Sequence, residues 1–400
     1  MLIAPDKFAG TLTARQAAEA IAAGWRRLAP ADTVELLPLA DGGPGFVDAI
    51  GVALDGRTLV VPVTGPLGAP ADGRVHCAGD AVYLEAADAC GLHLVPPDRW
   101  DPEKTTSYGV GQLLAAALDT GASRIVVGLG GSVTNDAGAG LLAALGAEPT
   151  DVLRGGGGAL VTLVGGDAGD AGGVRRAQGA VGGSSSPVAG AAGEAPSLAG
   201  GAVIDVEPAR RRVAGVELVI ASDVDSILYG NHGATVTYGP QKGATPEQVQ
   251  RLDAAIKRFA QLVDWRPANR PGAGAAGGLG YALLLLGGRR LPGAQVVLDA
   301  VGALDRARRA DLVLTGEGSF DWQSLRGKVV AGVARVAQQA ARPCVVLAGQ
   351  VRVGRRELSA IGVDAAYSAA EAAGSVDAAL ADPAGSLSAL AERVARTWSR

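Results

Sequence analysis

The chain has little of several residue types, and each shortage excludes a class of protein. Only 3 of its 400 residues are cysteines, and their scattered positions show none of the spacing of metal-binding motifs. An odd, dispersed set of cysteines is typical of a reducing compartment, so we expect a cytoplasmic protein. Aromatic residues make up only 4% of the chain, so alanine, valine, leucine and glycine must build most of the core.

Positive charge and long hydrophobic runs are also scarce. The net charge of −4 argues against a nucleic-acid partner, because binding to a phosphate backbone relies on clustered lysine and arginine. The longest apolar run, residues 281–286, is far shorter than the roughly 20 residues of a membrane span. The first 30 residues lack a basic start followed by an apolar block and a cleavage site. We therefore expect no signal peptide and no membrane partner.

What is present is an alternation of strand and helix patterns. Four hundred residues exceed one typical core, so two domains are expected. Capping-box patterns at Thr13 and Thr245 predict the starts of two helices. Further helices are expected over 110–118 and 137–145, and strands over 2–5, 34–39, 124–129, 216–221, 311–314 and 343–347. This alternation predicts an α/β architecture with largely parallel sheets.

Polar clusters follow most of the predicted strands. In parallel α/β sheets, ligands bind at the carboxyl ends of the strands. The clusters are Asp6 with Lys7, Asp41 with Gly42 and Gly43, residues 132–136, residues 223–225 and residues 317–321. Their recurrence at strand ends predicts one shared active site.

The most conspicuous of these segments is the loop Gly-Leu-Gly-Gly-Ser-Val-Thr-Asn-Asp at 128–136, which lies between a strand and a helix. Glycines let the backbone approach an anion closely, and amides at the start of the next helix favour negative charge. The loop lacks the Gly-Lys-Ser/Thr of a Walker A motif and the distal acid of a dinucleotide site. A phosphate-handling loop is favoured, with a simple turn as the alternative.

Two further motifs carry charges. Asp223 and Asp225 lie two residues apart, so both face the same way if the segment is extended, and could hold Mg²⁺ or accept a proton. The alternative is a turn or a helix cap. Lys242 lies on a sharp turn before a helix, where it could clamp a phosphate or a carboxylate, or simply face solvent.

The second half of the chain offers two more candidates. The glycine loop at 271–280 could bind phosphate or allow close helix packing, and neither reading is favoured. Glu317, Asp321 and Lys328 combine acids and a base after a strand, which suits a metal–phosphate site, although Lys328 could be a surface group.

A different kind of segment lies between these motifs. Residues 155–201 are dominated by glycine, alanine, serine and aspartate, which cannot bury enough apolar surface to offset their ordering entropy. We expect residues from about 165 to 203 to form a flexible surface insertion.

Taken together, these motifs resemble the bacterial two-domain glycerate kinases of the glycerate 2-kinase type. The blocks that carry the resemblance are Ala-Pro-Asp-Lys-Phe at 4–8, Leu-Ala-Asp-Gly-Gly at 39–43, Val-Thr-Gly-Pro-Leu-Gly at 63–68, the loop at 128–136, Ser-Asp-Val-Asp at 222–225, Gly-Pro-Gln-Lys-Gly at 239–243, the loop at 271–280 and Thr-Gly-Glu-Gly at 315–318. They follow the order of the family over nearly the whole chain. Ala9 departs from the pattern, because many members carry a second lysine there.

The resemblance implies a fold and an activity. A flavodoxin- or Rossmann-like parallel-sheet domain would form from residues 1–60 and 295–400, with a second α/β domain, residues 61–294, inserted in it and the active site in the cleft between them. The implied reaction is phosphorylation of D-glycerate by ATP with Mg²⁺, more often at the 2-hydroxyl than at the 3-hydroxyl, by a monomer or homodimer. Alternatives are a kinase for another short hydroxy acid, a dinucleotide-dependent oxidoreductase and a non-catalytic sugar-acid sensor.

The expected site residues fall into three groups. The catalytic candidates are Asp6, Lys7, Asp223 and Asp225, and the metal candidates are Asp223, Asp225 and Glu317. The expected substrate- and nucleotide-binding residues are Asp41, Gly42, Gly43, Gly130, Gly131, Ser132, Thr134, Asn135, Asp136, Gln241, Lys242, Gly277, Gly278, Glu317, Asp321 and Lys328.

Overall fold

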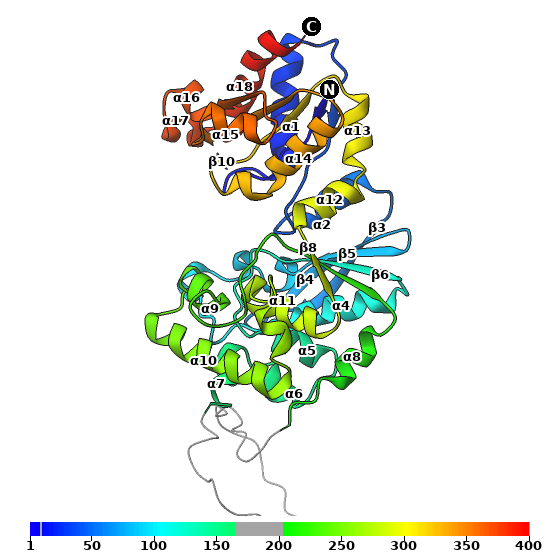
Figure 1. The fold of residues 1–400 in the computed structure, drawn as a ribbon, viewed down its shortest axis with the longest axis vertical. Helices are drawn as coiled ribbons and strands as arrows, with labels where there is room; N and C mark the ends of the chain where they lie inside the picture. The colour runs from blue at the N-terminus through cyan, green and yellow to red at the C-terminus, as the bar shows by residue number, and fades with distance from the viewer. Residues whose placement is uncertain (9, 165–202, 400) are drawn as a thin grey trace, which may run out of the picture.

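A computed structural model describes residues 1–8, 10–164 and 203–399 (Figure 1). Apart from Val203, the predicted insertion at 165–203 lies outside the described residues. Figure 1 shows two lobes: a terminal lobe that contains both chain ends, and a central lobe that contains strands β3 to β8. The predicted α/β class is confirmed.

The terminal lobe is built on a five-stranded, fully parallel sheet in the order β13-β11-β9-β1-β2. Its strands are β1 (Leu2–Ile3), β2 (Glu35–Leu36), β9 (Val313–Thr315), β11 (Cys344–Ala348) and β13 (Ala365–Ser368). The first two strands come from the start of the chain and the other three from its end. Counted along the sheet this is the flavodoxin-like order 2-1-3-4-5, in which the chain reverses its direction of winding between β1 and β9.

Helices cover both faces of this sheet, and the alternation of side chains along each strand explains how. Ile3 and Leu314 pack with Trp25 in the layer of α1 (Ala14–Leu28) and α18 (Pro383–Trp398). Leu2 and Val313 face the opposite layer, formed by α12 (Gly293–Ala300), α13 (Ala303–Arg309) and α14 (Val329–Gln339). The capping box predicted at Thr13 is present at the start of α1.

The central lobe is built on a six-stranded sheet in the order β3-β4-β5-β6-β7-β8. Its strands are β3 (Arg57–Thr64), β4 (Pro70–Ala78), β5 (Ala81–Glu85), β6 (Arg124–Gly128), β7 (Glu217–Ala221) and β8 (Arg289–Leu291). Strands β5 to β8 are parallel, whereas β3, β4 and β5 pair antiparallel. Strands β6 and β7 were expected from the sequence, whereas the antiparallel strands β3 and β4 were not.

One face of this sheet packs on helices of the central lobe, mainly α4 (Tyr108–Asp119), α5 (Ala139–Ala144), α10 (Pro246–Val263) and α11 (Ala275–Leu285). The predicted capping box at Thr245 is present at the start of α10. Other α-helices are α3 (Ala87–Cys90), α6 (Thr150–Leu153), α7 (Gly157–Val161), α8 (Glu207–Val213), α9 (Ala234–Tyr238), α15 (Arg355–Ala360), α16 (Ala369–Ala373) and α17 (Val376–Ala381), and two short strands are β10 (Ser319–Phe320) and β12 (Gln350–Val351).

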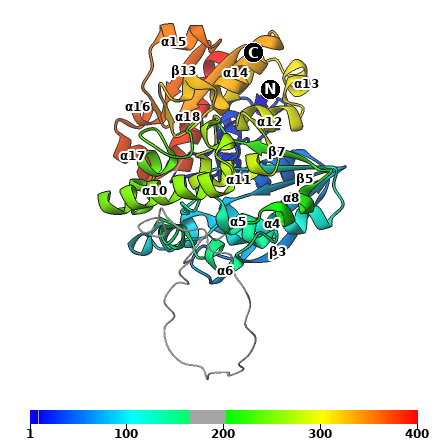
Figure 2. The same cartoon turned by 60° about the horizontal axis from the view of Figure 1, so that its bottom comes forward.

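The two lobes share a core at their junction. Tyr83, Val126 and Val219 point to the other face of the six-stranded sheet and pack in one cluster with residues of α2 (Phe46–Ala53) and α12. The same cluster continues to Leu2 and Val313 of the terminal sheet. Figure 2, turned toward the reader, shows α12 above the strands of the central lobe. Helices α2 and α12 therefore fix how the strand ends of the two sheets face each other.

Within the described part of the chain, no helix is long and apolar enough to cross a membrane. Cys90 and Cys344 are buried free thiols, and burial raises the pKa of each to about 12. Both thiols therefore stay neutral near neutral pH and lack the nucleophilic thiolate form.

Candidate active site

The reversal point of the terminal sheet lies between β1 and β9. In open α/β sheets, the carboxyl ends of the strands at such a point border the crevice where ligands bind. Asp6 follows β1 and Glu317 follows β9, and the Asp6 amide donates a hydrogen bond of 2.9 Å to the Gly316 carbonyl. Both carboxylates are buried. The fold thus brings together two acids that are 311 residues apart (317 − 6) in the sequence.

Lys7 links this crevice to the loop after β2. Its Nζ lies 3.3 Å from Oδ1 of Asp41 and 3.8 Å from Oδ1 of Asp6. Burial raises the pKa of Asp6 to about 6, the Asp41 charge adds to that rise and the Lys7 ammonium opposes it. Burial also favours the neutral form of Asp41, but the Lys7 ammonium and the Gly43 amide outweigh it, so the pKa of Asp41 falls. Lys7 therefore lies between two carboxyl groups whose pKa values are shifted in opposite directions.

Glu317 is the second unusual acid of the crevice. Burial raises its pKa to about 7, the Asp6 charge adds to the rise, and the Lys328 ammonium opposes it. Among the described residues, its Oε1 atom has no hydrogen-bond partner although it is buried. Lys328 lies immediately before α14. Its ammonium group also opposes the rise in the pKa of Asp6 and adds to the fall in the pKa of Asp41. These predicted residues are therefore gathered into one electrostatic cluster.

The loop at Gly42 and Gly43 is pressed against loops of the central lobe. A methyl group on Gly42 would lie 2.4 Å from the Ala221 carbonyl oxygen, and one on Gly130 would lie 2.6 Å from the Gly43 Cα. Gly42 also has a φ of +89°, which other residues rarely adopt. These glycines let the backbones of three strand ends meet beside Lys7.

Asp223 and Asp225 do not form the pair that their spacing predicted. Asp223 accepts hydrogen bonds from the Gly293 and Ala294 amides at the start of α12, and burial with the nearby Asp41 charge raises its pKa to about 6. The Asp225 side chain is 76% exposed and pairs with Arg290 at 2.8 Å. The two diverge because residues 222–226 are not a strand, so the two-residue alternation does not apply.

The expected metal set of Asp223, Asp225 and Glu317 is also not gathered. Within the described ranges, no group of three or more histidine, cysteine or acidic side chains could hold a metal ion. The oxygens of Asp223 are engaged by α12, and Asp225 is engaged by Arg290. Of the three, Glu317 keeps a buried oxygen available for a ligand.

Lys242 supports the loop at 128–136 from behind. It is only 3% exposed, and its Nζ donates to Ser132 Oγ at 3.0 Å and to the Thr134 carbonyl at 2.7 Å. Burial lowers its pKa to about 8. The lysine therefore holds the shape of the loop, and its predicted role as a phosphate clamp would require it to leave both partners.

Asn135 and Asp136 turn into the interior of the central lobe. The Asn135 amide donates to Thr235 Oγ1 at 2.9 Å. Asp136 accepts hydrogen bonds from the amide and hydroxyl of Ser107, both at 2.8 Å, and from the Gly138 amide at 3.0 Å. Both side chains are fully buried. The structure thus gives them a supporting role where substrate contact was expected.

The structure explains the second glycine loop, residues 271–280, by close packing. Ala276, Gly277 and Gly278 all have positive φ at the start of α11. A methyl group on Gly277 would lie 1.9 Å from the Thr134 carbonyl oxygen, and one on Gly278 would lie 2.4 Å from the Ala137 Cα. Close approach to the first glycine loop, rather than an open phosphate cradle, explains these glycines.

Three other residues that were expected to bind substrate or nucleotide lie outside the charge cluster. Gln241 is exposed. The Asp321 carboxylate accepts from the Gln323 amide at 2.8 Å and so shapes a turn. A methyl group on Gly131 would lie 2.6 Å from Pro44 Cγ, which places this glycine at the contact between the lobes.

Glu85 is a buried acid that was not among the expected site residues. It ends β5, is 2% exposed, and accepts from the amides of Gly45 and Phe46 at the start of α2. Burial raises its pKa to about 7, and the Asp88 charge adds to the rise. The rule that polar residues follow strands would have found it, had the strand over 81–85 been recognised.

Glu85 makes stability depend on pH. The folded chain keeps a proton that the unfolded chain loses above its ordinary pKa of 4.5, so the free energy of unfolding should fall as the pH rises from about 4.5 to 7. The shift corresponds to about 3 kcal/mol. In Glu85→Gln, urea titrations at several pH values should no longer show this fall in the free energy of unfolding. Glu19→Gln, an exposed control, should follow the wild-type curve; an unchanged pH dependence in Glu85→Gln would refute the assignment.

Comparison with known proteins shows the family to which this chain is related. A model of the glycerate kinase family matches residues 1–168 and 153–399. A glycerate kinase from Halalkalibacterium halodurans is 38% identical over 95% of this chain and 93% of its own, and one from Haemophilus influenzae is 37% identical over 99% and 97%. A glycerate 2-kinase from Escherichia coli is 34% identical over 95% and 92%.

A solved structure gives the same answer for the fold. A protein from Salmonella typhimurium LT2, provisionally described as glycerate kinase 2, superposes with a TM-score of 0.73 at 36% identity, covering 99% of this chain and 97% of its own. The two-lobed α/β chain is therefore a kinase. It belongs to the glycerate kinase family, which confirms the resemblance and favours the kinase over the oxidoreductase and the sensor.

Proposed function

We propose that this chain phosphorylates D-glycerate with ATP and produces 2-phosphoglycerate. The observation that carries the proposal is the cluster of Asp6, Lys7 and Asp41 at the reversal point of the parallel sheet. Phosphoryl transfer depends on positioning and charge neutralisation more than on covalent catalysis. A half-buried lysine between two carboxylates offers a cation for phosphoryl oxygens and an acceptor for the hydroxyl proton. The E. coli relative named glycerate 2-kinase supports the choice of the 2-hydroxyl.

In this proposal, Lys7 neutralises charge on the transferred group and Asp6 accepts the proton of the glycerate hydroxyl. A general base works best when its pKa lies near the working pH, and burial raises the pKa of Asp6 to about 6. Asp223 has a similar pKa but is the weaker candidate, because amides of α12 engage its oxygens. Lys328 balances charge on the same cluster.

Magnesium fits this site through Glu317. Proteins usually hold Mg²⁺ with one or two carboxylates, and phosphates and water complete its octahedron. The buried, unpartnered Oε1 of Glu317 suits that role. When bound with the donor phosphates, the ion would neutralise negative charge during transfer.

The direct test is to incubate the protein with ATP, Mg²⁺ and D-glycerate and to identify the product by NMR. We expect 2-phosphoglycerate and an equal amount of ADP. The 3-isomer would overturn the proposed position of transfer, and faster turnover of tartronate would overturn the proposed acceptor. No ADP release above background with any short hydroxy acid would refute the kinase function.

Two matched substitutions separate the aspartates of the 222–225 segment. Asp225→Asn should leave kcat within about twofold, because an exposed ion pair contributes little. Asp223→Asn should lower kcat by about tenfold, because its carboxylate positions α12 beside the Gly42–Gly43 loop. Steady-state assays of both variants decide the matter. Full kcat in both would mean that neither aspartate contributes to catalysis.

Three expectations stay predictions. They are a cytoplasmic location, a monomeric or homodimeric state, and domain boundaries at residues 60 and 295. The second boundary falls inside α12, a helix that belongs to the shared core of both lobes. Size-exclusion chromatography with light scattering measures the oligomeric state directly.

A further inference from the structure

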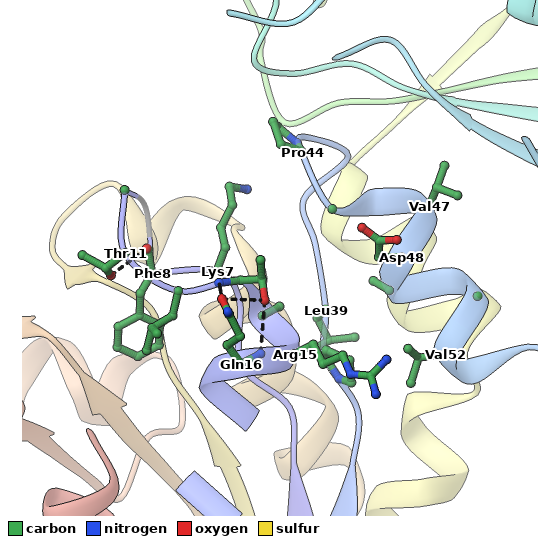
Figure 3. A pocket seen from close by; sticks show the side chains of 18 of the residues that line it. Lys7, Phe8, Thr11, Arg15, Gln16, Leu39, Pro44, Val47, Asp48 and Val52 are labelled. Carbon is green, nitrogen blue, oxygen red and sulfur yellow. Dashed lines mark hydrogen bonds between the residues drawn. The ribbon is translucent and has the colours of Figure 1, made fainter. Parts of the chain in front are cut away.

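A cavity of about 590 Å³ lies beside the charge cluster, with Phe8 and residues 10–16 on one side and helix α2 on the other. Figure 3 shows Lys7, Phe8, Thr11 and Gln16 on one side of it and Val47, Asp48 and Val52 on the other. Apart from Lys7, none of the residues with a proposed catalytic role lines this space.

The walls of the cavity are mostly apolar in character. Side chains of Phe8, Leu12, Leu39, Val47 and Val52 line it. Apolar walls with few free polar groups are typical of pockets that bind a flat or drug-sized organic group, and unsuited to a small polyanion.

Several polar side chains of the lining already have partners within the protein. Thr13 and Gln16 bond to each other in the capping box of α1. The Thr58 hydroxyl lies 3.0 Å from Nδ1 of His76, and Arg15 pairs with Glu19 at 2.9 Å. Most of the surface left for a ligand is therefore apolar contact area, which favours burial of an aromatic ring.

Size separates the two substrates of the proposed reaction. Pockets of roughly 300–1,000 Å³ bind drug-sized ligands, and glycerate has only three carbon atoms. A nucleoside, with a base and a ribose, suits a cavity of about 590 Å³. Of the two substrates, the nucleoside part of ATP fits the space better.

Charge gives the direction in which the nucleotide would lie. Lys7 lines the cavity and also contacts Asp41 in the charge cluster. Asp48, which pairs with Arg74, lies on the α2 side of the cavity and would repel phosphates. A nucleoside in the cavity would thus extend its phosphates toward Lys7, where the acceptor hydroxyl is expected.

We propose that this cavity, between Phe8 with residues 10–16 on one side and α2 on the other, binds the base and ribose of the nucleoside triphosphate donor. The inference rests on the proposed function and deepens it, because it assigns the donor to one part of the fold.

The test blocks the cavity from its exposed edge. Val52 is 48% exposed on α2, so Val52→Trp adds an indole without disturbing the core. Val236→Trp, on α9 and outside the lining, is the matched control, since Val236 is 40% exposed. Calorimetric titration with ADP should give a Kd raised by about tenfold or more in Val52→Trp and an unchanged value in the control.

Kinetics then separate this inference from the function itself. We expect Val52→Trp to raise KM for ATP and to leave KM for glycerate unchanged. If wild-type protein phosphorylates glycerate but Val52→Trp keeps its affinity for ADP, or loses affinity only for glycerate, the cavity assignment is overturned and the function stands. If Val52→Trp weakens ADP binding but wild-type protein transfers no phosphate to glycerate, the function fails and the cavity assignment stands.

A second measurement uses the unmodified protein and guards against misfolding of the variant. Photolabelling with 8-azido-ATP, followed by peptide mass spectrometry, should mark peptides that contain residues 10–16 or 46–52. Excess ADP should suppress that labelling. Labelling confined to other peptides would overturn the assignment.

Discussion

Replacing Lys7 by alanine should lower kcat/KM for glycerate by about 1,000-fold, because it removes the cation that lies between Asp6 and Asp41. Three effects act together. The transferred phosphoryl group loses a neutralising charge. Asp6 and Asp41 lose their common cationic partner. The phosphates of a nucleotide in the cavity also lose the lysine that would direct them toward the acceptor hydroxyl.

The pH dependence should change in the same variant. Lys7 holds the pKa of Asp41 below its ordinary value and opposes the rise in the pKa of Asp6 that burial causes. Without the ammonium, both pKa values should move upward. The acidic limb of the pH–rate profile should therefore shift to higher pH, an effect that a merely destabilised protein would not show.

Lys257→Ala is the matched control for this prediction. Lys257 lies exposed on α10, far along the chain from the crevice residues, so its replacement should leave kcat and both KM values unchanged. Circular dichroism should show that both variants are folded. A Lys7→Ala protein that is folded and keeps more than about a tenth of the wild-type kcat/KM would remove Lys7 from the catalytic machinery.

Local signals in the sequence predicted local structure correctly. The capping boxes at Thr13 and Thr245 are present because each needs only the first turn of its own helix. The parallel strands β6 and β7 were recognisable as short buried runs of apolar residues. The antiparallel strands β3 and β4 were overlooked because their half-exposed, mixed composition gives a weaker pattern.

The site was predictable only as far as strand ends determine it. Asp6, Lys7, Asp41 and Glu317 follow strands of one parallel sheet, so the rule for such sheets brings them together. Burial of Lys242 had no local signal, because it depends on contacts with a loop more than 100 residues earlier in the chain. The same holds for the nucleoside cavity, whose two walls come from separate elements.

Asp136 is a residue for which sequence and structure give opposite expectations, and its replacement decides between them. As a substrate ligand, its loss would raise KM; as a buried support, its loss would lower stability. It accepts hydrogen bonds from Ser107, Gly138 and Gly140, all of which lie in the interior. We expect Asp136→Ala to lower the free energy of unfolding by about 4 kcal/mol, because several buried donors lose their acceptor.

Urea titration of Asp136→Ala against Asp253→Ala gives the comparison. Asp253 is half-buried and accepts from one amide, that of Gly230, so its loss should cost only about 1 kcal/mol. In the folded fraction of Asp136→Ala, KM for ATP and for glycerate should match the wild type. Unchanged stability with a raised KM would return Asp136 to the substrate site and would mean that the loop at 128–136 opens when ligand binds.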